Sequence, residues 1–451
     1  MAVYGSYSAW TSPAIPHLTS VNSTFPVTDA QGGWIVSLLM LGDLIGGLII
    51  PLFIDRIGRK YTLLLFTLPG LIGWILIIFA KNYLYLYLAR FIAGIGEGGI
   101  YTTLVIYLTE ISEKNIRGAL VNMINLSLSV SIFIFSSIAA HTSYMTLNLA
   151  SASLPIIFII MFPLLLETPY YYLMKGRNNE ALQSLMKLRG INEPEKLETD
   201  ISEMKLAIDE DRKLSKSGFM ELISKSYNRK GLLIVFFMKL TQFLSGIVAI
   251  SAYAQEIFSE SSPSLNPKFQ VMILTGFPIL ATLVTNIVID RFNRRTLFLT
   301  TGLLAAVCLG SIGSFFFMQL YLKADVSSIK LLPLVSLVVF YAVYMLGFGT
   351  IPYIVQGELF PISVKGNAVT IGMIVGAFFA FGTSAGYSAV SNAVGTYTTF
   401  WSFASAVLFG SVVTYWITPE TKGMTLEEIQ AIQNPEIKKK LELERNKKRA
   451  A

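Results

Sequence analysis

The sequence predicts an all-α membrane protein built from two related six-helix bundles, and three observations predict this fold class. Only 14% of the 451 residues are charged and 53% are hydrophobic, whereas soluble domains carry roughly 25% charged residues. Several apolar runs reach the length of about 20 residues that a helix needs to cross a bilayer. Charged motifs from the first half of the chain recur in the second half. Water-soluble folds are therefore excluded.

Apolar runs separated by charged loops predict the membrane-spanning helices. Their expected ranges are 33–54, 61–80, 84–109, 118–140, 148–166, 231–257, 269–289, 296–318, 332–357, 366–391 and 398–417. A twelfth helix is expected in Met1–Leu18, which is short for a span and contains Pro13 and Pro16. Either the sequence is truncated inside this first helix or the helix itself is shortened, and the residues leave both interpretations open.

Lys and Arg residues gather on one side of the predicted helices. Of 35 such residues, 29 lie in alternate loops and the C-terminal tail, while the opposite loops hold four and the spans two. Cytoplasmic loops carry the excess of positive charge, so this side is predicted to be cytoplasmic in a multi-pass protein of the cell membrane. The orientation places the glycosylation acceptor sequence that begins at Asn22 outside the cell.

Apolar and charged segments divide the chain into four parts. We expect an N-terminal six-helix bundle at 1–169, a cytoplasmic linker at 170–230, a C-terminal six-helix bundle at 231–417 and a cytoplasmic tail at 418–451. Within the linker, Lys175–Arg189 carries an amphipathic stripe, and Glu195–Asp211 is predicted as a second short helix. These helices are either solvated connectors, which is the favoured interpretation, or a latch beneath the bundles.

Acidic and basic residues recur in the same order in both halves, at the predicted cytoplasmic ends of helices. There an acid of one helix can pair with an Arg of a neighbour, and a parallel internal repeat is one known plan of membrane transporters. We interpret the residues as a cytoplasmic gate rather than as membrane anchors. They are Asp55, Arg56, Arg59, Glu110, Arg117, Glu167, Asp290, Arg291, Arg294, Arg295, Glu358, Lys365 and Glu420.

Ionisable side chains also lie within or at the edges of predicted spans, where a charge costs roughly 2.5 kcal/mol or more near the centre. They are Asp43, Arg90, Glu97 and Lys239. Glu97 follows Arg90 by seven residues and so lies two turns along the same face of the helix. Proton exchange by Glu97 is one interpretation, and a structural pair with Arg90 or with another helix is the favoured one.

Two glycine-rich stretches lie inside predicted helices and do not follow a strand, so they are not phosphate-binding loops. Small residues let helix backbones approach closely in membranes. We expect this packing role for Gly42, Gly46, Gly47, Gly94, Gly96, Gly98 and Gly99.

Residue types that catalysis or metal binding would require are scarce. Cys308 is the single cysteine, and His17 and His141 are far apart, so we expect no disulfide, metal site or cofactor. No carboxylate pair or activated nucleophile is placed as in an enzyme. The basic residues are not interleaved with aromatic ones, so nucleic-acid binding is not expected.

Motifs spread along nearly the whole chain resemble those of the sugar porter family of the major facilitator superfamily. Among them are Asp-Arg-x-Gly-Arg-Lys at 55–60, Glu-Thr-Pro-Tyr-Tyr-Tyr-Leu at 167–173, Gln-Phe-Leu-Ser-Gly-Ile at 242–247 and Pro-Glu-Thr-Lys-Gly at 419–423. Trp10-Thr-Ser-Pro13 is similar to the insect branch of the family, which includes facilitated trehalose transporters. The resemblance implies the major facilitator fold and a small-molecule sugar as substrate.

The resemblance also implies which residues meet the sugar. Gln242 matches a glutamine that hydrogen-bonds sugar hydroxyls, and Tyr253 matches an aromatic residue that closes over the sugar. Asn125 and Tyr353 stand where other members have Gln and Trp, and Phe243 stands in place of a second Gln. Together these five residues form the expected substrate site.

Several polar groups of the family are replaced in this sequence. Val248 and Pro278 stand where amide side chains are common, and Gly376 and Ala377 replace an Asn-Trp pair. Each lost hydrogen bond should weaken the binding of a small hexose by about 1 kcal/mol. The site is therefore expected to be wider or to take a less polar solute, or else the protein no longer transports.

These features predict a facilitative carrier of a sugar, either trehalose or glucose-like, that works by alternating access. Proton symporters of the family commonly have an acid in the first helix, and Gly5–Pro13 has none. A non-transporting sugar sensor of the same fold and a carrier of another polyol-like solute are the alternatives. The expected partners are the solute and the lipid bilayer.

Overall fold

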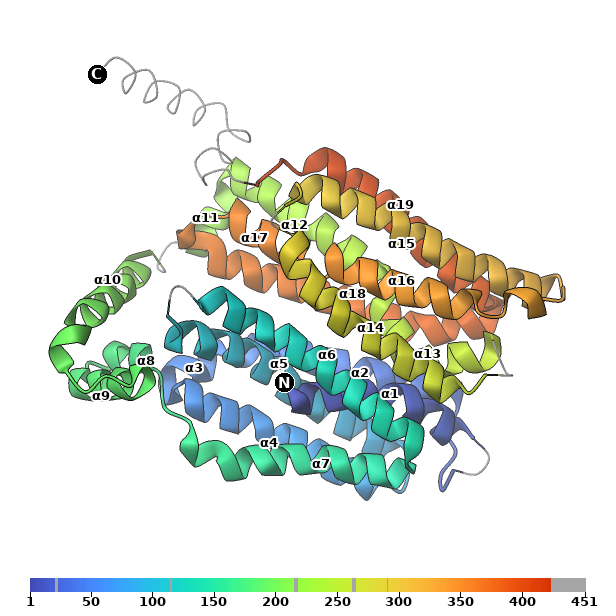
Figure 1. Ribbon diagram of the computed structural model, residues 1–451, viewed down its shortest axis with the longest axis horizontal. Helices are drawn as coiled ribbons and strands as arrows, with labels where there is room; N and C mark the ends of the chain where they lie inside the picture. The colour runs from blue at the N-terminus through green and yellow to red at the C-terminus, as the bar shows by residue number, and fades with distance from the viewer. Residues whose placement is uncertain (21–22, 114–115, 215–217, 262–264, 290, 423–451) are drawn as a thin grey trace, which may run out of the picture. The chain divides into compact units, whose positions relative to one another are not determined.

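The computed structural model describes residues 1–20, 23–113, 116–214, 218–261, 265–289 and 291–422, and in this part of the chain every regular element is a helix (Figure 1). Within these residues, 11 helical stretches are long and apolar enough to cross a membrane. Each of the separate spans that the sequence predicted between residues 33 and 417 overlaps one of these helical stretches. The prediction of an all-α membrane protein is confirmed.

The described residues up to 214 fold into ten α-helices. They are α1 (Ala2–Thr19), α2 (Asp29–Ile49), α3 (Pro51–Ile57), α4 (Arg59–Ile78), α5 (Tyr83–Ile111), α6 (Arg117–His141), α7 (Tyr144–Met161), α8 (Pro169–Met174), α9 (Asn178–Arg189) and α10 (Glu198–Leu214). Helix α1 is as short as expected and is not among the candidate spans, but most of it is buried, including Trp10. It is therefore a packed element despite the prolines within it.

Nine α-helices follow in the described residues of the second part of the chain. They are α11 (Gly218–Ser224), α12 (Ser226–Leu244), α13 (Ile247–Ser261), α14 (Pro267–Val288), α15 (Arg294–Phe316), α16 (Leu332–Leu346), α17 (Ile351–Leu359), α18 (Ile362–Val394) and α19 (Thr396–Ile417). Helices α15 and α19 run side by side, as Figure 1 shows.

Three of the predicted spans are each divided into two α-helices, and the span at 33–54 divides at Ile50, between α2 and α3. The span at 231–257 breaks between α12 and α13 at Gly246, whose φ of +75° favours glycine. A Cβ there would also lie 2.2 Å from the Phe403 ring. The span at 332–357 breaks at 347–350, a segment that contains Gly349 and ends two residues before Pro352.

The chain forms two compact units. The first contains Met1–Lys213, Ala249–Ile279 and Ser384–Ala389, and the second contains Leu214–Val248, Leu280–Thr383 and Val390–Ala451. Within the first unit, the backbone N–H of Gln255 on α13 donates to Ser12 Oγ on α1 over 3.0 Å. Because the unit boundaries fall inside α14 and α18, the division into bundles at 1–169 and 231–417 stays a prediction.

Helices α2 and α5 of the first unit pack backbone against backbone through glycines. A Cβ at Gly46 would lie 2.2 Å from the carbonyl oxygen of Ile95, so a larger residue there would push the helices apart. Comparable close approaches between α2 and α5 occur at Gly42, Gly94 and Gly98, whereas Gly96 and Gly99 of α5 lie against the carbonyl oxygen and the ring of Phe66 on α4. No atom lies within 4 Å of a Cβ built at Gly47, so a larger side chain there would not disturb the packing, although the Gly47 backbone nitrogen lies close to Gly98.

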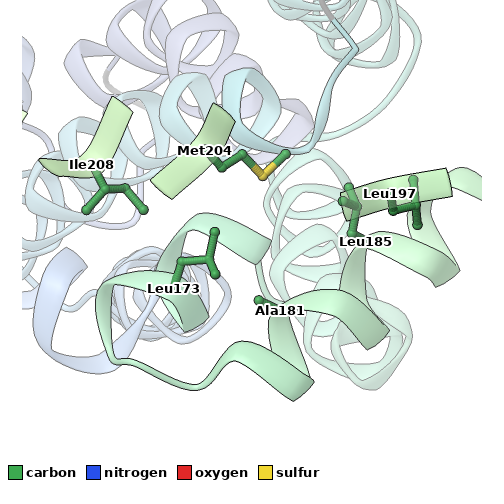
Figure 2. Close-up of a cluster of buried hydrophobic side chains, with 6 residues drawn as sticks. All are labelled: Leu173, Ala181, Leu185, Leu197, Met204 and Ile208. Atoms are coloured by element: carbon green, nitrogen blue, oxygen red, sulfur yellow. The ribbon is translucent and has the colours of Figure 1, made fainter. Parts of the chain in front are cut away.

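Helices α8, α9 and α10 have an apolar core of their own within the first unit (Figure 2). This linker core consists of the buried residues Leu173, Ala181, Leu185, Leu197, Met204 and Ile208. It is tied to the end of α5, because Arg189 donates to the Ile111 carbonyl oxygen over 3.0 Å and lies 3.6 Å from the Glu113 carboxylate. The amphipathic stripe predicted in α9 is thus buried in part, and the role of these helices as a latch stays a prediction.

Candidate functional site

Arg59, at the start of α4, is the centre of a charge cluster in the first unit. Its guanidinium lies 2.8 Å from Glu110 Oε1 on α5 and 3.1 Å from Asp55 Oδ1 on α3. The Glu167 carboxylate, which follows α7, accepts from the backbone N–H groups of Arg59 and Lys60 over 3.0 and 3.1 Å. The predicted gate residues Asp55, Arg59, Glu110 and Glu167 therefore meet. We call this group the first charge cluster.

Thr168 completes the first charge cluster. Its hydroxyl donates to Glu110 Oε2 over 2.5 Å, and its backbone N–H donates to Glu167 Oε1 over 2.9 Å. Burial raises the pKa of the Glu167 carboxyl, whereas the N–H groups of Thr168, Lys60 and Arg59 lower it. The cluster thus joins the ends of α4 and α5 to the segment that leads into α8.

A second charge cluster in the second unit repeats this arrangement. The Arg294 guanidinium, at the start of α15, lies 3.6 Å from Glu358 Oε1 on α17. The Glu420 carboxylate accepts from the backbone N–H groups of Arg294 and Arg295 over 3.0 and 3.3 Å, and the Thr421 hydroxyl donates to Glu358. The same Arg, Glu, Glu and Thr thus bond in the same pattern in both units, as the repeated motifs led us to expect.

The remaining predicted gate residues differ in their environments. Arg56 and Arg291 are exposed, and their backbone carbonyl oxygens accept from the Tyr171 hydroxyl and the Lys422 ammonium. The Arg295 guanidinium stacks 4.1 Å from the centre of the Tyr415 ring, and Lys365 is half-buried. Asp290, Asn22 and the side chain of Arg117 lie outside the described residues. The gate function of the whole set stays a prediction.

The Arg90 side chain is buried among α1, α2 and α5 of the first unit. Its guanidinium donates to Thr11 Oγ1 over 2.7 Å and to the carbonyl oxygens of Tyr7 and Ile35 over 3.2 Å each. Glu97 is only 2% exposed, and its carboxylate has no hydrogen-bond partner among the described residues. The structural pair that we favoured, of Glu97 with Arg90 or with another helix, is therefore not seen as a hydrogen bond among the described residues, and Arg90 instead ties α1 and α2 to α5.

Three predicted substrate-binding residues meet around Lys239 in the second unit. The Lys239 ammonium donates to Gln242 Oε1 over 3.0 Å. It also lies 3.4 Å from the centre of the Tyr353 ring and 5.9 Å from that of Phe243. The sequence marked Lys239 only as a charge within a span, although its spacing of three residues from Gln242 places both on one face of α12. We call these four residues the lysine group.

Two of the departures from the family pattern pack against each other. A Cβ at Gly376 would lie 2.6 Å from the Phe243 ring, so this ring fits only because position 376 has no side chain. Gln242 is 2% exposed, and its side chain is also hydrogen-bonded with Tyr344. The surroundings of Gln242 are therefore more aromatic and less rich in amides than the family pattern implies.

Tyr253 and Asn125 lie in the first unit. Tyr253 on α13 is buried, and its ring stacks on that of Tyr387 with a centroid distance of 4.7 Å and an interplanar angle of 24°. Asn125 on α6 is exposed. That either residue shares a site with Gln242 stays a prediction. In the part of the chain that the structure describes, no three His, Cys, Asp or Glu residues are grouped so as to hold a metal ion.

Comparisons with known proteins agree with this architecture. A family model described as sugar (and other) transporter matches residues 1–432. The facilitated trehalose transporter Tret1 of Culex quinquefasciatus is 31% identical over 433 residues, which are 95% of this chain and 82% of that protein. The Tret1 of Aedes aegypti is also 31% identical over 433 residues, but these cover only 53% of its length.

Among solved structures, the inward-open xylose transporter XylE from E. coli is similar to this chain with a TM-score of 0.80 and 18% identity. The alignment covers 96% of this chain and 97% of XylE. XylE belongs to the major facilitator superfamily. The likeness shows that the fold is of the major facilitator type.

Proposed function

Because the chain belongs to the sugar (and other) transporter family, we propose that it carries a sugar across the membrane by facilitated diffusion. The observation that carries the proposal is Gln242, a polar side chain that is 2% exposed within a candidate membrane span and lies among aromatic rings. Polar side chains inside the membrane are expensive and are usually functional. An amide beside aromatic faces suits a polyol, which offers hydroxyls and C–H surfaces.

Trehalose and a glucose-like sugar are the proposed substrates. The relatives at 31% identity are named facilitated trehalose transporters, which supports trehalose. The absence of an acid from Gly5–Pro13 supports diffusion down the sugar gradient rather than coupling to protons.

We further propose that transport proceeds by alternating access of two six-helix bundles, at 1–169 and 231–417. Parallel repeats of this kind support such a cycle in other transporters. The two charge clusters would brace the cytoplasmic helix ends of their own units, and the excess of Lys and Arg supports placing these ends in the cytoplasm. The linker at 170–230 and the tail at 418–451 would then also be cytoplasmic.

Uptake into proteoliposomes tests the proposal. Radiolabelled trehalose, glucose and sorbitol should be compared with and without an imposed proton gradient, and we expect saturable sugar uptake that the gradient does not change. Sugar binding without uptake or counterflow would instead identify a sensor. Uptake of sorbitol alone would identify a carrier of another polyol.

Substitution Gln242→Ala tests the site itself. Losing one or two hydrogen bonds to a neutral sugar costs about 1 kcal/mol each, so sugar uptake should fall about 5- to 30-fold. The matched control is Gln183→Ala, because Gln183 is exposed on α9. Normal uptake by the Gln242 variant would show that the substrate binds elsewhere.

A further inference from the structure

The Lys239 ammonium is buried in the second unit without an acidic partner. The residue is 1% exposed and lies within the candidate span Ser226–Ser261. Its partners are the side-chain oxygen Oε1 of Gln242, 3.0 Å from Nζ, and the face of the Tyr353 ring. Among the described residues, no Asp or Glu forms an ion pair with it.

The neutral partners of this ammonium contact it favourably, but they do not balance its positive charge. An amide oxygen accepts one of its three N–H donors, and an aromatic face attracts the cation. Neither supplies the negative charge with which buried cations are usually paired. Within membranes, such an unbalanced residue marks a substrate or ion site by default, and the partner is often the ligand.

The Tyr353 ring, which lies over the Lys239 ammonium, is placed so that a ligand could enter beside it. Tyr353 is 44% exposed and lies near the start of α17, directly after the helix break at 347–350. Its ring covers the ammonium at 3.4 Å. A rotation of this side chain would expose the ammonium, leaving two of its N–H donors for the ligand.

We propose that Lys239 makes the carrier select sugars that bear a carboxylate, such as hexuronates, over neutral hexoses. This inference rests on the proposed sugar transport, but it makes an acidic sugar rather than trehalose or glucose the preferred substrate. The ammonium binds the carboxylate through charge-assisted hydrogen bonds, while Gln242 meets hydroxyls and the Tyr353 ring meets C–H surface. The replacement of amide side chains by Phe243 and Gly376 is then understandable, because a single charged contact takes over the role of several neutral ones.

The unsubstituted protein provides the first test. Initial rates of radiolabelled glucuronate and glucose uptake are measured in proteoliposomes, with a membrane potential set by a potassium gradient and valinomycin. We expect glucuronate to enter at least tenfold faster, and an inside-positive potential to increase its accumulation because each turnover carries one negative charge inward. Entry of glucose alone would overturn the inference and leave the proposed transport standing. Entry of trehalose without glucuronate would likewise overturn the inference alone. If glucuronate, glucose and trehalose all fail to enter, both the inference and the proposed sugar transport are overturned.

Variants of Lys239 provide the second test. In Lys239→Gln, the ratio of glucuronate to glucose uptake should fall at least tenfold, and Lys239→Arg should retain most of the ratio because it keeps the charge. The matched control is Lys81→Gln, since Lys81 is exposed between α4 and α5. An unchanged ratio in Lys239→Gln would contradict the inference. If this variant does not fold, the potential dependence of the unsubstituted protein decides the question.

Discussion

Replacement of Arg59 by Met should destabilise the protein more than the same replacement of Arg294. The Arg59 side chain is 6% exposed and lies 2.8 Å from Glu110, whose side chain is 13% exposed. The corresponding pair in the second unit is longer, at 3.6 Å, and the Glu358 side chain is 28% exposed. The two clusters share their Arg, two Glu and Thr, so burial, distance and the additional Asp55–Arg59 pair of the first cluster are the main described differences between them.

The magnitude follows from the charge that each substitution leaves unpaired. Removing one partner of a buried ion pair costs about 3–5 kcal/mol, because the other charge stays buried. We expect a loss of this size for Arg59→Met. Exposed pairs contribute about 1 kcal/mol or less, and the partly exposed Glu358 should bring the loss for Arg294→Met to about 1–2 kcal/mol.

Equilibrium unfolding in mixed micelles of dodecyl maltoside and sodium dodecyl sulfate measures both losses in free energy. The double variant Arg59→Met/Glu110→Gln should recover part of the loss, because the Glu110 carboxylate, which Arg59 pairs in the unsubstituted protein, is no longer left buried without its cation. Equal losses at Arg59 and Arg294, or no recovery in the double variant, would refute this electrostatic explanation.

Three further substitutions test the packing and the uncoupled mechanism. Gly46→Ala should lower the free energy of unfolding by about 1–3 kcal/mol because its Cβ would lie 2.2 Å from the Ile95 carbonyl oxygen; Gly47→Ala is the control, and equal effects in mixed-micelle unfolding would contradict the packing. Glu97→Gln should keep sugar uptake and its insensitivity to a pH gradient; a gradient dependence that this substitution abolishes would instead show proton coupling. Leu185→Ala should lower the free energy of unfolding of the linker core by about 2–5 kcal/mol and should therefore speed limited proteolysis at 170–230. An unchanged rate of cleavage would mean that this core does not hold the linker helices together.

Much of the fold could be predicted from the sequence because its signals are local. A run of apolar residues has to reach the thickness of a bilayer whatever surrounds it, so each span could be placed to within a few residues. The repeated motifs also predicted that acids and bases would meet at the helix ends, and Arg59, Glu110 and Glu167 do meet. Apolar length carries no information on where a helix breaks, however, so the break at Gly246 was not foreseen.

The neighbours of each buried polar group were decided by tertiary structure. Helical periodicity tells which residues share a face, but not which other helix that face will meet. Glu97 and Arg90 share a face, yet the guanidinium bonds to Thr11 on α1. Lys239 and Gln242 also share a face, and only the packing of α12 against α17 brings the Tyr353 ring over the ammonium. The sequence by itself therefore determined the membrane fold and its repeat, whereas the packing of distant helices determined which charges are paired and which are left for a ligand.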